Sequence, residues 1–167
     1  MIVVNLFGGA GCGKSTMAAR IFHELKSKGI SAELVGEYAK DCVYNKSYKE
    51  MSDQLWLFAN QAHRLRNLSR YGVKVAVCDS PLLLSIAYQK FESHIFEWLV
   101  REEMERYDNL NFFLTRNDDF WRTDGRTGNL ESAKKIDKEV LGLLKDEKFD
   151  KICCYDYDYV VNKVLKY

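Results

Sequence analysis

The sequence predicts an α/β domain in which a five-stranded parallel sheet carries helices on both faces. Short apolar runs alternate along the chain with longer segments whose apolar residues recur every three or four positions, as in amphipathic helices. Parallel strands need crossover connections, and these helical segments are long enough to supply them. The 167 residues, 47% apolar and 29% charged, have the length and composition of a globular domain, so we expect one domain over residues 1–167.

Composition narrows the range of functions. The 25 Lys and Arg residues balance 24 Asp and Glu residues, which argues against a strongly basic nucleic-acid clamp or an acidic tail. The five cysteines have no Cys-x-x-Cys spacing, which favours free thiols in a reducing cytosol over a disulfide framework. No apolar run approaches the ~20 residues needed to cross a bilayer. We expect a cytoplasmic monomer or homodimer without a membrane partner.

The first part of the chain contains three expected strands. An apolar run at Ile2–Phe7 ends in two glycines and predicts the first strand. The helical spacing that follows predicts a helix over Lys14–Lys28, which Gly29 closes as a C-cap. Further strands are expected at Ser31–Gly36 and Val73–Cys78.

Between the second and third strands we expect a polar, tyrosine-rich loop and then one long helix. The loop covers residues 41–49, and the helix covers Met51–Arg70 and ends at Gly72. Trp56 and Phe58 are interpreted as core aromatics of this helix. Its predicted buried face comprises Leu55, Phe58, Ala59, Ala62, Leu65 and Leu68.

The alternation continues in the second half of the chain. Pro81 suits the first turn of a helix. A later helix over Phe91–Tyr107 is expected to bury Ile95, Leu99 and Met104. The remaining expected elements are strands at Asn111–Thr115 and Lys151–Tyr155 and helices at Leu130–Leu144 and Tyr159–Leu165.

Residues 8–15 match the phosphate-binding pattern G-x-x-x-x-G-K-[ST], between an expected strand and an expected helix, as this motif requires. Glycines let backbone N–H groups turn inward around an anion, and the helix N-terminus adds a positive dipole end. We expect Lys14, as a cation on a surface loop, to reach the β- and γ-phosphates of ATP, Ser15 to ligate Mg²⁺ and Thr16 to reach the α-phosphate. The expected nucleotide-binding residues of the loop are Gly8, Gly9, Ala10, Gly11, Cys12, Gly13, Lys14, Ser15 and Thr16. The motif therefore predicts the three-layer sandwich of P-loop NTPases.

Other motifs separate the classes of P-loop protein. GTPase switches read guanine with Asn-Lys-x-Asp, whereas both Asn-Lys pairs of this chain, at residues 45–46 and 162–163, lack the aspartate. Motor-type ATPases usually carry a glutamate after the strand-end aspartate, but Ser80 follows Asp79 here. Small kinases remain.

Two acids are expected beside the phosphate loop. Asp79 ends the third strand and Glu37 follows the second, and the carboxyl ends of parallel strands share one edge of a sheet. We expect Asp79 to hold Mg²⁺ and Glu37 to orient or deprotonate the acceptor hydroxyl. A surface acid or a helix cap is the alternative for each.

The polar segment at residues 116–129 is interpreted as a lid that closes over the phosphates. Its arginines would neutralise charge on the transferred group. We expect Arg116 to bind the nucleotide and Arg122 and Arg126 to be catalytic. The alternative is three solvated arginines on a surface loop.

Several short segments resemble one family, in order along nearly the whole chain. Residues 36–41, Gly-Glu-Tyr-Ala-Lys-Asp, resemble the segment after the second strand of nicotinamide riboside kinase domains, which occur in bifunctional bacterial NAD-biosynthesis proteins. Residues 58–61, 77–80 and 121–126 are similar to that family's substrate-side helix, strand-end aspartate and lid. The resemblance implies the fold and chemistry of a small P-loop kinase, a group whose stand-alone relatives include nucleoside and nucleotide kinases, some of them viral.

The acceptor site is expected at Tyr38, Gln61 and Arg64. An aromatic ring can stack on a base, a glutamine can read its edge, and an arginine can bind a phosphate or ribose. The expected function is ATP- and Mg²⁺-dependent transfer of a γ-phosphoryl group to a nucleoside, nucleotide or related small acceptor. Two alternatives stay open: a hydroxyl of a polynucleotide or modified DNA base as acceptor, which the near-neutral charge disfavours, and a non-transferring ATP-binding switch.

Overall fold

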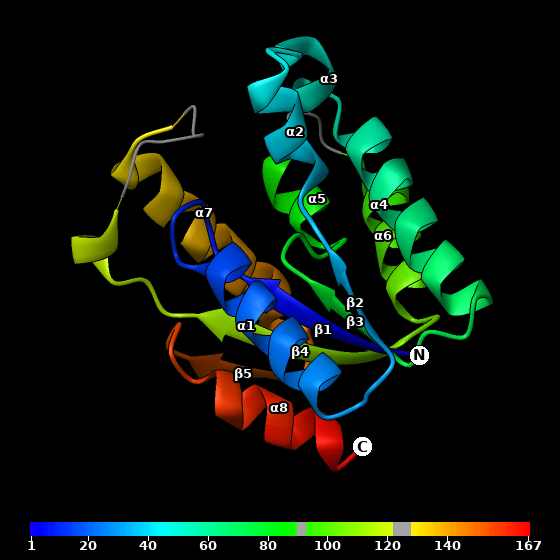
Figure 1. Cartoon of the computed structure of the whole chain (residues 1–167). Coiled ribbons are helices and arrows are strands. Elements are labelled where there is room, and N and C mark those ends of the chain that lie inside the picture. The colour runs from blue at the N-terminus through cyan, green and yellow to red at the C-terminus, as the bar shows by residue number, and fades with distance from the viewer. Residues whose placement is uncertain (90–92, 122–127) are drawn as a thin grey trace.

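Five parallel strands form one sheet in the computed structural model, which describes residues 1–89, 93–121 and 128–167. The strands lie in the order β2-β3-β1-β4-β5, so the first strand of the chain is the central one (Figure 1). Their bounds are β1 Ile2–Phe7, β2 Ala32–Val35, β3 Val75–Cys78, β4 Asp108–Leu114 and β5 Phe149–Ile152. This sheet confirms the predicted α/β class.

Helices connect the strands and cover both faces of the sheet (Figure 1). The α-helices within the described ranges are α1 Lys14–Ser27, α2 Tyr38–Tyr44, α3 Tyr48–Ser52, α4 Gln54–Arg70, α5 Leu84–Tyr88, α6 His94–Met104, α7 Leu130–Leu143 and α8 Tyr157–Leu165. Short 3₁₀ turns occur at η1 Asp118–Phe120 and η2 Leu144–Asp146. None of the helices in these ranges has both the length and the apolar character needed to span a bilayer.

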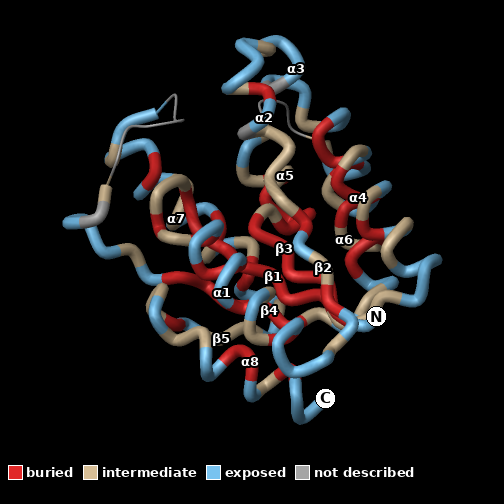
Figure 2. The backbone as a smooth tube through the Cα atoms, in the orientation of Figure 1, coloured by how far each residue is buried: buried red, intermediate tan, exposed pale blue. Residues whose placement is uncertain are grey.

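Side chains of the sheet alternate between two cores. Val4 and Leu6 of β1 belong to the core shared with α1 and α8. Val3 and Phe7 of the same strand belong to the core shared with α4, α5, α6 and α7. Successive side chains of a strand point to opposite faces, which produces this division. Figure 2 shows the buried strands between helices whose outer sides are exposed, so the predicted three-layer arrangement is confirmed.

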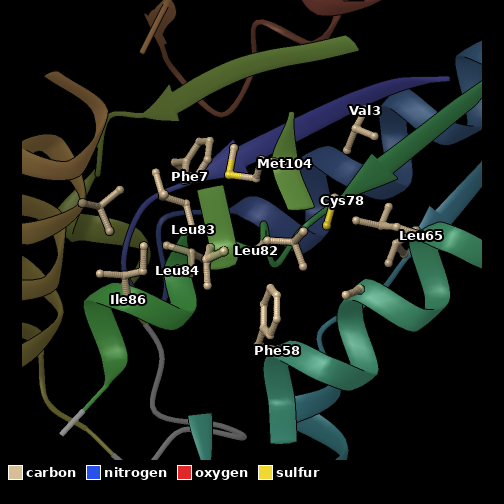
Figure 3. Close-up of a cluster of buried hydrophobic side chains, with 14 of the residues drawn as sticks. Val3, Phe7, Phe58, Leu65, Cys78, Leu82, Leu83, Leu84, Ile86 and Met104 are labelled. Atoms are coloured by element: carbon tan, nitrogen blue, oxygen red, sulfur yellow. The ribbon is translucent and has the colours of Figure 1, made fainter. Parts of the chain in front are cut away.

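The core on the α4 side contains an aromatic contact between two helices, α4 and α6. Figure 3 shows Leu65 of α4 lying beside Cys78 of β3, and Phe58 of the same helix belongs to this core. Phe58 also meets Phe96 of α6 edge to face, with ring centroids 5.6 Å apart. Such a pair contributes about 0.5–1.5 kcal/mol beyond its buried area. Phe58 is therefore a core aromatic as predicted, whereas Trp56 is 36% exposed and the prediction for it is wrong.

Polar side chains inside the sheet are paired with one another. The side chain of Asn5 on β1 donates to the side-chain oxygens of Asn109 and Asn111 on β4, both at 2.9 Å. Asn109 in turn donates to the carbonyls of Met104 and Tyr107. Because these amides have partners, they avoid the cost of burying an unpaired polar group, and they favour the observed register of β1 against β4.

The segment after β2 differs from the prediction. The sequence predicts a loop over residues 41–49, but the structure has α2 and α3 there. Cys42 of α2 is buried, and this burial stabilises a short helix that a polar, tyrosine-rich sequence does not favour by itself. The Asp53 side chain accepts a hydrogen bond from the Trp56 N–H at 3.0 Å and caps α4. The helix therefore begins at Gln54 and does not continue from Met51.

The buried face of α4 is rotated from the predicted one. Leu55 and Ala59 are exposed, whereas Leu57 and Gln61 are buried. The prediction considered apolar residues only. It missed Gln61 because the partner that satisfies this buried amide, the carbonyl of Ser80, comes from another part of the chain.

The same error affects α6. The sequence predicts that Ile95 and Leu99 point inward, but they are 80% and 38% exposed. Phe96, Val100 and the polar Glu103 form the buried side of this helix, together with Met104, whose burial was predicted correctly. Because the charged residue Glu103 lies on the buried side, apolar residues alone do not mark that side of the helix.

Boundaries in the second half of the chain also shift. Pro81 lies in a turn ahead of α5, where its carbonyl accepts from the N–H of Leu84 at 3.0 Å. The strands β4 and β5 begin at Asp108 and Phe149, both earlier than predicted. The start that was predicted for the helix at 91–107 falls on residues 90–92, outside the described ranges.

The buried acid Glu103 provides a test of the packing between α4 and α6. It is 2% exposed and accepts from Arg66 at 2.7 and 2.8 Å and from Arg106 at 2.9 Å. We expect Glu103→Ala to lower the free energy of unfolding by about 2–3 kcal/mol, because hydrogen bonds to charged groups contribute roughly 1.5–3 kcal/mol. Urea denaturation measures this loss. The control Glu97→Ala removes a more exposed pair with Arg101 and should cost about 0.5 kcal/mol or less, so equal losses would contradict the prediction.

Candidate nucleotide and acceptor site

The phosphate loop joins the carboxyl end of β1 to α1, and its backbone has the conformation that the motif requires. Gly8, Gly11 and Gly13 have φ angles of 137°, 79° and 96°. Residues with side chains rarely adopt such angles, which explains why glycine occupies these positions. Gly13 is the N-cap of α1, and as a glycine it has no side chain that could cap this helix by a hydrogen bond. The N–H groups at the helix N-terminus can therefore bind an anion.

Lys14 is buried within this loop. Its side-chain ammonium donates to the carbonyls of Gly8 at 2.7 Å and Gly9 at 2.9 Å, and the residue is 9% exposed. The expectation of an exposed surface cation is therefore wrong, because the side chain turns back onto the carbonyls of its own loop. Burial by itself lowers the pKa of Lys14, but nearby acidic groups outweigh it and the pKa is raised. In order of effect, these groups are Cys12, Glu37, Tyr88 and Asp79.

Glu37 and Asp79 lie at the same edge of the sheet as the phosphate loop. The register pairs Val35 with Cys78 at the carboxyl ends of β2 and β3, so the residues that follow these strands come close together. Asp79 is 6% exposed. Both carboxylates contribute to the raised pKa of Lys14, which means that their charge acts on its ammonium. The structure thus brings the two predicted acids and the predicted phosphate-binding cation together.

A cavity of about 940 Å³ opens over the phosphate loop. This volume is typical of a small-molecule site. Its walls are the loop itself, α2, α4 and α5 on one side and α7 on the other (Figure 1). The lining residues outside the loop include Glu37, Tyr38, Gln54, Leu57, Gln61, Ser80, Tyr88, Trp121, Ser132, Lys135, Ile136 and Glu139. The sequence analysis missed Tyr88 and the α7 residues, since no motif marks them.

The acceptor side of this cavity combines the Tyr38 ring with one buried amide. The Tyr38 ring meets the Trp56 ring edge to face, with centroids 5.0 Å apart. The Gln61 amide donates to the carbonyl of Ser80 at 3.0 Å and to the Cys78 sulfur at 3.3 Å. Burial raises the pKa of the Cys78 thiol to about 12, so it is an inert, neutral partner. These contacts orient the Gln61 amide in the cavity wall.

Arg64 lies behind this wall and is not among the lining residues. Its guanidinium donates to the carbonyl of Gly36 at 3.1 Å and lies 5.0 Å from the centroid of the Tyr38 ring. A weaker ion pair, at 3.9 Å, joins it to Asp41. Of the three predicted acceptor residues, the structure brings Tyr38 and Gln61 to the cavity, while Arg64 supports the backbone on either side of Glu37.

Arg116 follows β4 and is held by an acid that the sequence analysis did not single out. Its Nε donates to Asp137 of α7 at 2.7 Å, and its Nη1 donates to the carbonyl of Ala10 at 2.6 Å. Asp137 also accepts from the N–H of Gly9 at 2.5 Å. The predicted nucleotide-binding arginine thus contacts the phosphate loop. The other two predicted arginines of the lid, Arg122 and Arg126, lie outside the described residues, and their roles stay predictions.

The chemistry of the available ligands fits Mg²⁺. Within the described ranges, no group of three or more His, Cys, Asp or Glu side chains could hold a metal ion. Mg²⁺ in phosphoryl-transfer sites takes one or two carboxylates, hydroxyl and water oxygens, and phosphate oxygens of the substrate. The Ser15 hydroxyl, which lines the cavity, and the buried Asp79 carboxylate are ligands of this kind.

The phosphate loop at the end of a central parallel strand and the five-stranded order with helices on both faces define a P-loop protein with the fold of nucleoside and nucleotide kinases. A family model described as an AAA domain matches residues 3–158. This match covers most of the chain, which therefore belongs to the AAA-domain family.

Two structures of deoxyadenosine kinase from M. mycoides share this fold. The structure with bound dATP matches with a TM-score of 0.63 and 15% identity, over 98% of this chain and 97% of that chain. A second, with the products dCMP and a flexible dCDP bound, has a TM-score of 0.60 and 15% identity, over 98% of both chains. At this identity the likeness shows the fold, and it confirms the predicted P-loop architecture. No curated protein sequence matches the chain significantly.

Gly13 offers a direct test of the loop conformation. A Cβ at this position would lie 2.9 Å from the Cβ of Cys154, and its φ of 96° disfavours any side chain. We expect Gly13→Ala to distort the N-terminus of α1 and to weaken ATP binding at least tenfold in calorimetric titration. The matched control is Gly72→Ala, where φ is 75° and nothing lies within 4 Å of the added atom. It should cost about 1–2 kcal/mol of stability and leave ATP affinity unchanged, and unchanged affinity in Gly13→Ala as well would refute the prediction.

Proposed function

We propose that this protein is an ATP- and Mg²⁺-dependent kinase that transfers the γ-phosphoryl group to a hydroxyl of a nucleoside, nucleotide or related small acceptor. One observation carries the proposal: a single cavity is lined both by the phosphate loop and by Glu37, Tyr38 and Gln61. A donor phosphate on the loop and an acceptor beside these side chains would therefore share one enclosed space, as direct transfer needs. The kinase fold of the comparison structures supports this reading.

The donor side of the proposal rests on the loop and its charges. Backbone N–H groups of residues 11–15 would hold the phosphates, with Lys14 as the cation beside the β- and γ-phosphates. Ser15 and Asp79 would hold Mg²⁺, which supplies charge neutralisation on the phosphate oxygens when bound. Arg122 and Arg126 would add cations from a lid at about residues 116–129.

On the acceptor side, Glu37 would accept the proton of the attacking hydroxyl. It follows β2 at the sheet edge, lines the cavity, and acts electrostatically on Lys14, so it lies on the expected path between acceptor and phosphate. Tyr38, which lines the cavity and packs against Trp56, provides aromatic surface for a base, and the oriented amide of Gln61 provides an edge contact. A mixed aromatic and amide wall favours a nucleoside-like acceptor. We also propose that residues 1–167 act as one kinase domain.

A transfer assay tests the proposal as a whole. Labelled ATP is incubated with panels of nucleosides, nucleotides and oligonucleotides, and the labelled product is identified. We expect transfer to a small acceptor, and loss of that transfer in Lys14→Met, which keeps the aliphatic stem but removes the cation. A thermal unfolding curve close to that of the parent is the control for folding. Transfer to oligonucleotides alone would favour the polynucleotide alternative, and ATP binding without any transfer would favour a switch.

Substitutions of the two acids, Asp79 and Glu37, are predicted to have different effects on the reaction. Asp79→Asn should raise the Mg²⁺ concentration needed for half-maximal rate, because an amide is a weaker ligand than a carboxylate. Glu37→Gln should lower kcat about 10²–10⁴-fold with little change in ATP affinity, the range that general base catalysis supplies. Rate measurements over a Mg²⁺ series separate the two. A parental rate in Glu37→Gln would remove this residue from the chemistry.

A further inference from the structure

We propose that Arg116 and Asp137 form a positioning pair that holds the phosphate loop in its nucleotide-binding conformation, so that Arg116 acts on the nucleotide through the loop and does not contact it. The proposal rests on the proposed use of the loop for ATP. It changes the role that the sequence suggests for Arg116 and assigns one to Asp137.

The pair contacts two consecutive residues of the loop. It accepts a hydrogen bond from the first and donates one to the second. Asp137 Oδ1 accepts from the Gly9 N–H at 2.5 Å, and Arg116 Nη1 donates to the Ala10 carbonyl at 2.6 Å. Within the pair, Arg116 Nε donates to Oδ2 at 2.7 Å and Nη2 donates to Oδ1 at 3.2 Å. Each guanidinium nitrogen therefore has an acceptor, which uses three of its five N–H donors, and Arg116 is not among the residues that line the cavity.

Burial makes these bonds effective. The side chains of Arg116 and Asp137 are only 6% and 14% exposed, so little water competes for them. The helix that carries Asp137 also packs directly against the loop, because a Cβ on Gly9 would lie 2.5 Å from the carbonyl oxygen of Ala133. The loop has no space to move toward α7, and the ion pair holds it there.

Lys14 also bonds to the loop, and it shares Gly9 with the pair. Its ammonium bonds to the Gly8 and Gly9 carbonyls, but a lysine that turns to a phosphate gives up those bonds. The Arg116–Asp137 pair is independent of this exchange. It can keep residues 9 and 10 in place whether or not Lys14 is engaged, so the N–H groups further along the loop stay oriented for an anion.

Direct contact and positioning predict opposite signs for Asp137→Asn. If Arg116 bound phosphate directly, loss of the Asp137 charge would release the guanidinium, remove a nearby anion and tighten ATP binding. If the pair positions the loop, the substitution weakens binding. The amide NH2 group that replaces one carboxylate oxygen is a donor, so it cannot accept the hydrogen bond that this oxygen accepted. The expected loss is about tenfold, the scale of one charge-assisted hydrogen bond.

The experiment is calorimetric titration of ATP in the presence of Mg²⁺ into the full chain and its variants. We expect about tenfold weaker binding in Asp137→Asn, at least as large a loss in Arg116→Met, and no further loss in the double variant. The control is Asp150→Asn, which breaks the ion pair with Lys163 between β5 and α8, away from the loop. It should lower stability in urea and leave ATP affinity at the parental value, which is the result of a merely structural role and differs from the affinity loss expected for Asp137→Asn.

Parental or tighter binding in Asp137→Asn would overturn the proposal. So would a further loss in the double variant beyond Arg116→Met, since Asp137 would then act without Arg116. If the parent protein binds ATP but transfers no phosphoryl group, the proposed function fails while these affinities still decide the role of the pair. If the parent does not bind ATP at all, both are overturned.

Discussion

The backbone of the phosphate loop, with its positive φ angles at Gly8, Gly11 and Gly13, is the constraint on which the rest of the structure depends. A loop of this shape presents N–H groups to an anion only while both of its ends are fixed. At one end β1 is the central strand, and its side chains pack into both cores. At the other end α1 is fixed to the sheet by fully buried residues such as Met17 and Ile21. The most conformationally demanding segment therefore joins the two best-anchored elements of the fold.

The charges beside this loop largely offset one another. Lys14 lies under the influence of Glu37 and Asp79, and Arg116 is paired with Asp137. The attraction of the loop for a polyphosphate therefore depends on oriented N–H groups, the helix dipole and the cation that accompanies the nucleotide, more than on an excess of basic side chains. Because the pKa of Lys14 is raised, its ammonium stays charged throughout the neutral range, and this balance does not change with pH there.

The parts of the site that the sequence predicts are those determined by local rules. The motif and its place between a strand and a helix locate the loop, and the shared edge of parallel strands places Glu37 and Asp79 beside it. Asp137 escapes such rules, since its bond to Gly9 joins positions 128 residues apart. The surroundings of Lys14 likewise include distant parts of the chain, since Glu37, Tyr88 and Asp79 all act on its ammonium. The rotated faces of α4 and α6 show the complementary error: a buried polar residue is invisible to apolar periodicity when its partner lies elsewhere.

The two halves of the cavity are built from elements of different stability. The donor half uses β1 and the 14-residue α1, whereas the acceptor half uses α2, α3 and α5, of 7, 5 and 5 residues. Helices this short do not persist without tertiary contacts. Here Arg64 links the start of α2 to α4 through the Gly36 carbonyl and the Tyr38 ring. The cavity-lining residues Tyr38 and Gln61 of this half belong to neither the sheet nor the phosphate loop. In the proposed kinase, cavity-lining side chains of α2, α4 and α5 would determine the choice of acceptor, while the phosphate loop and its supports would bind the donor.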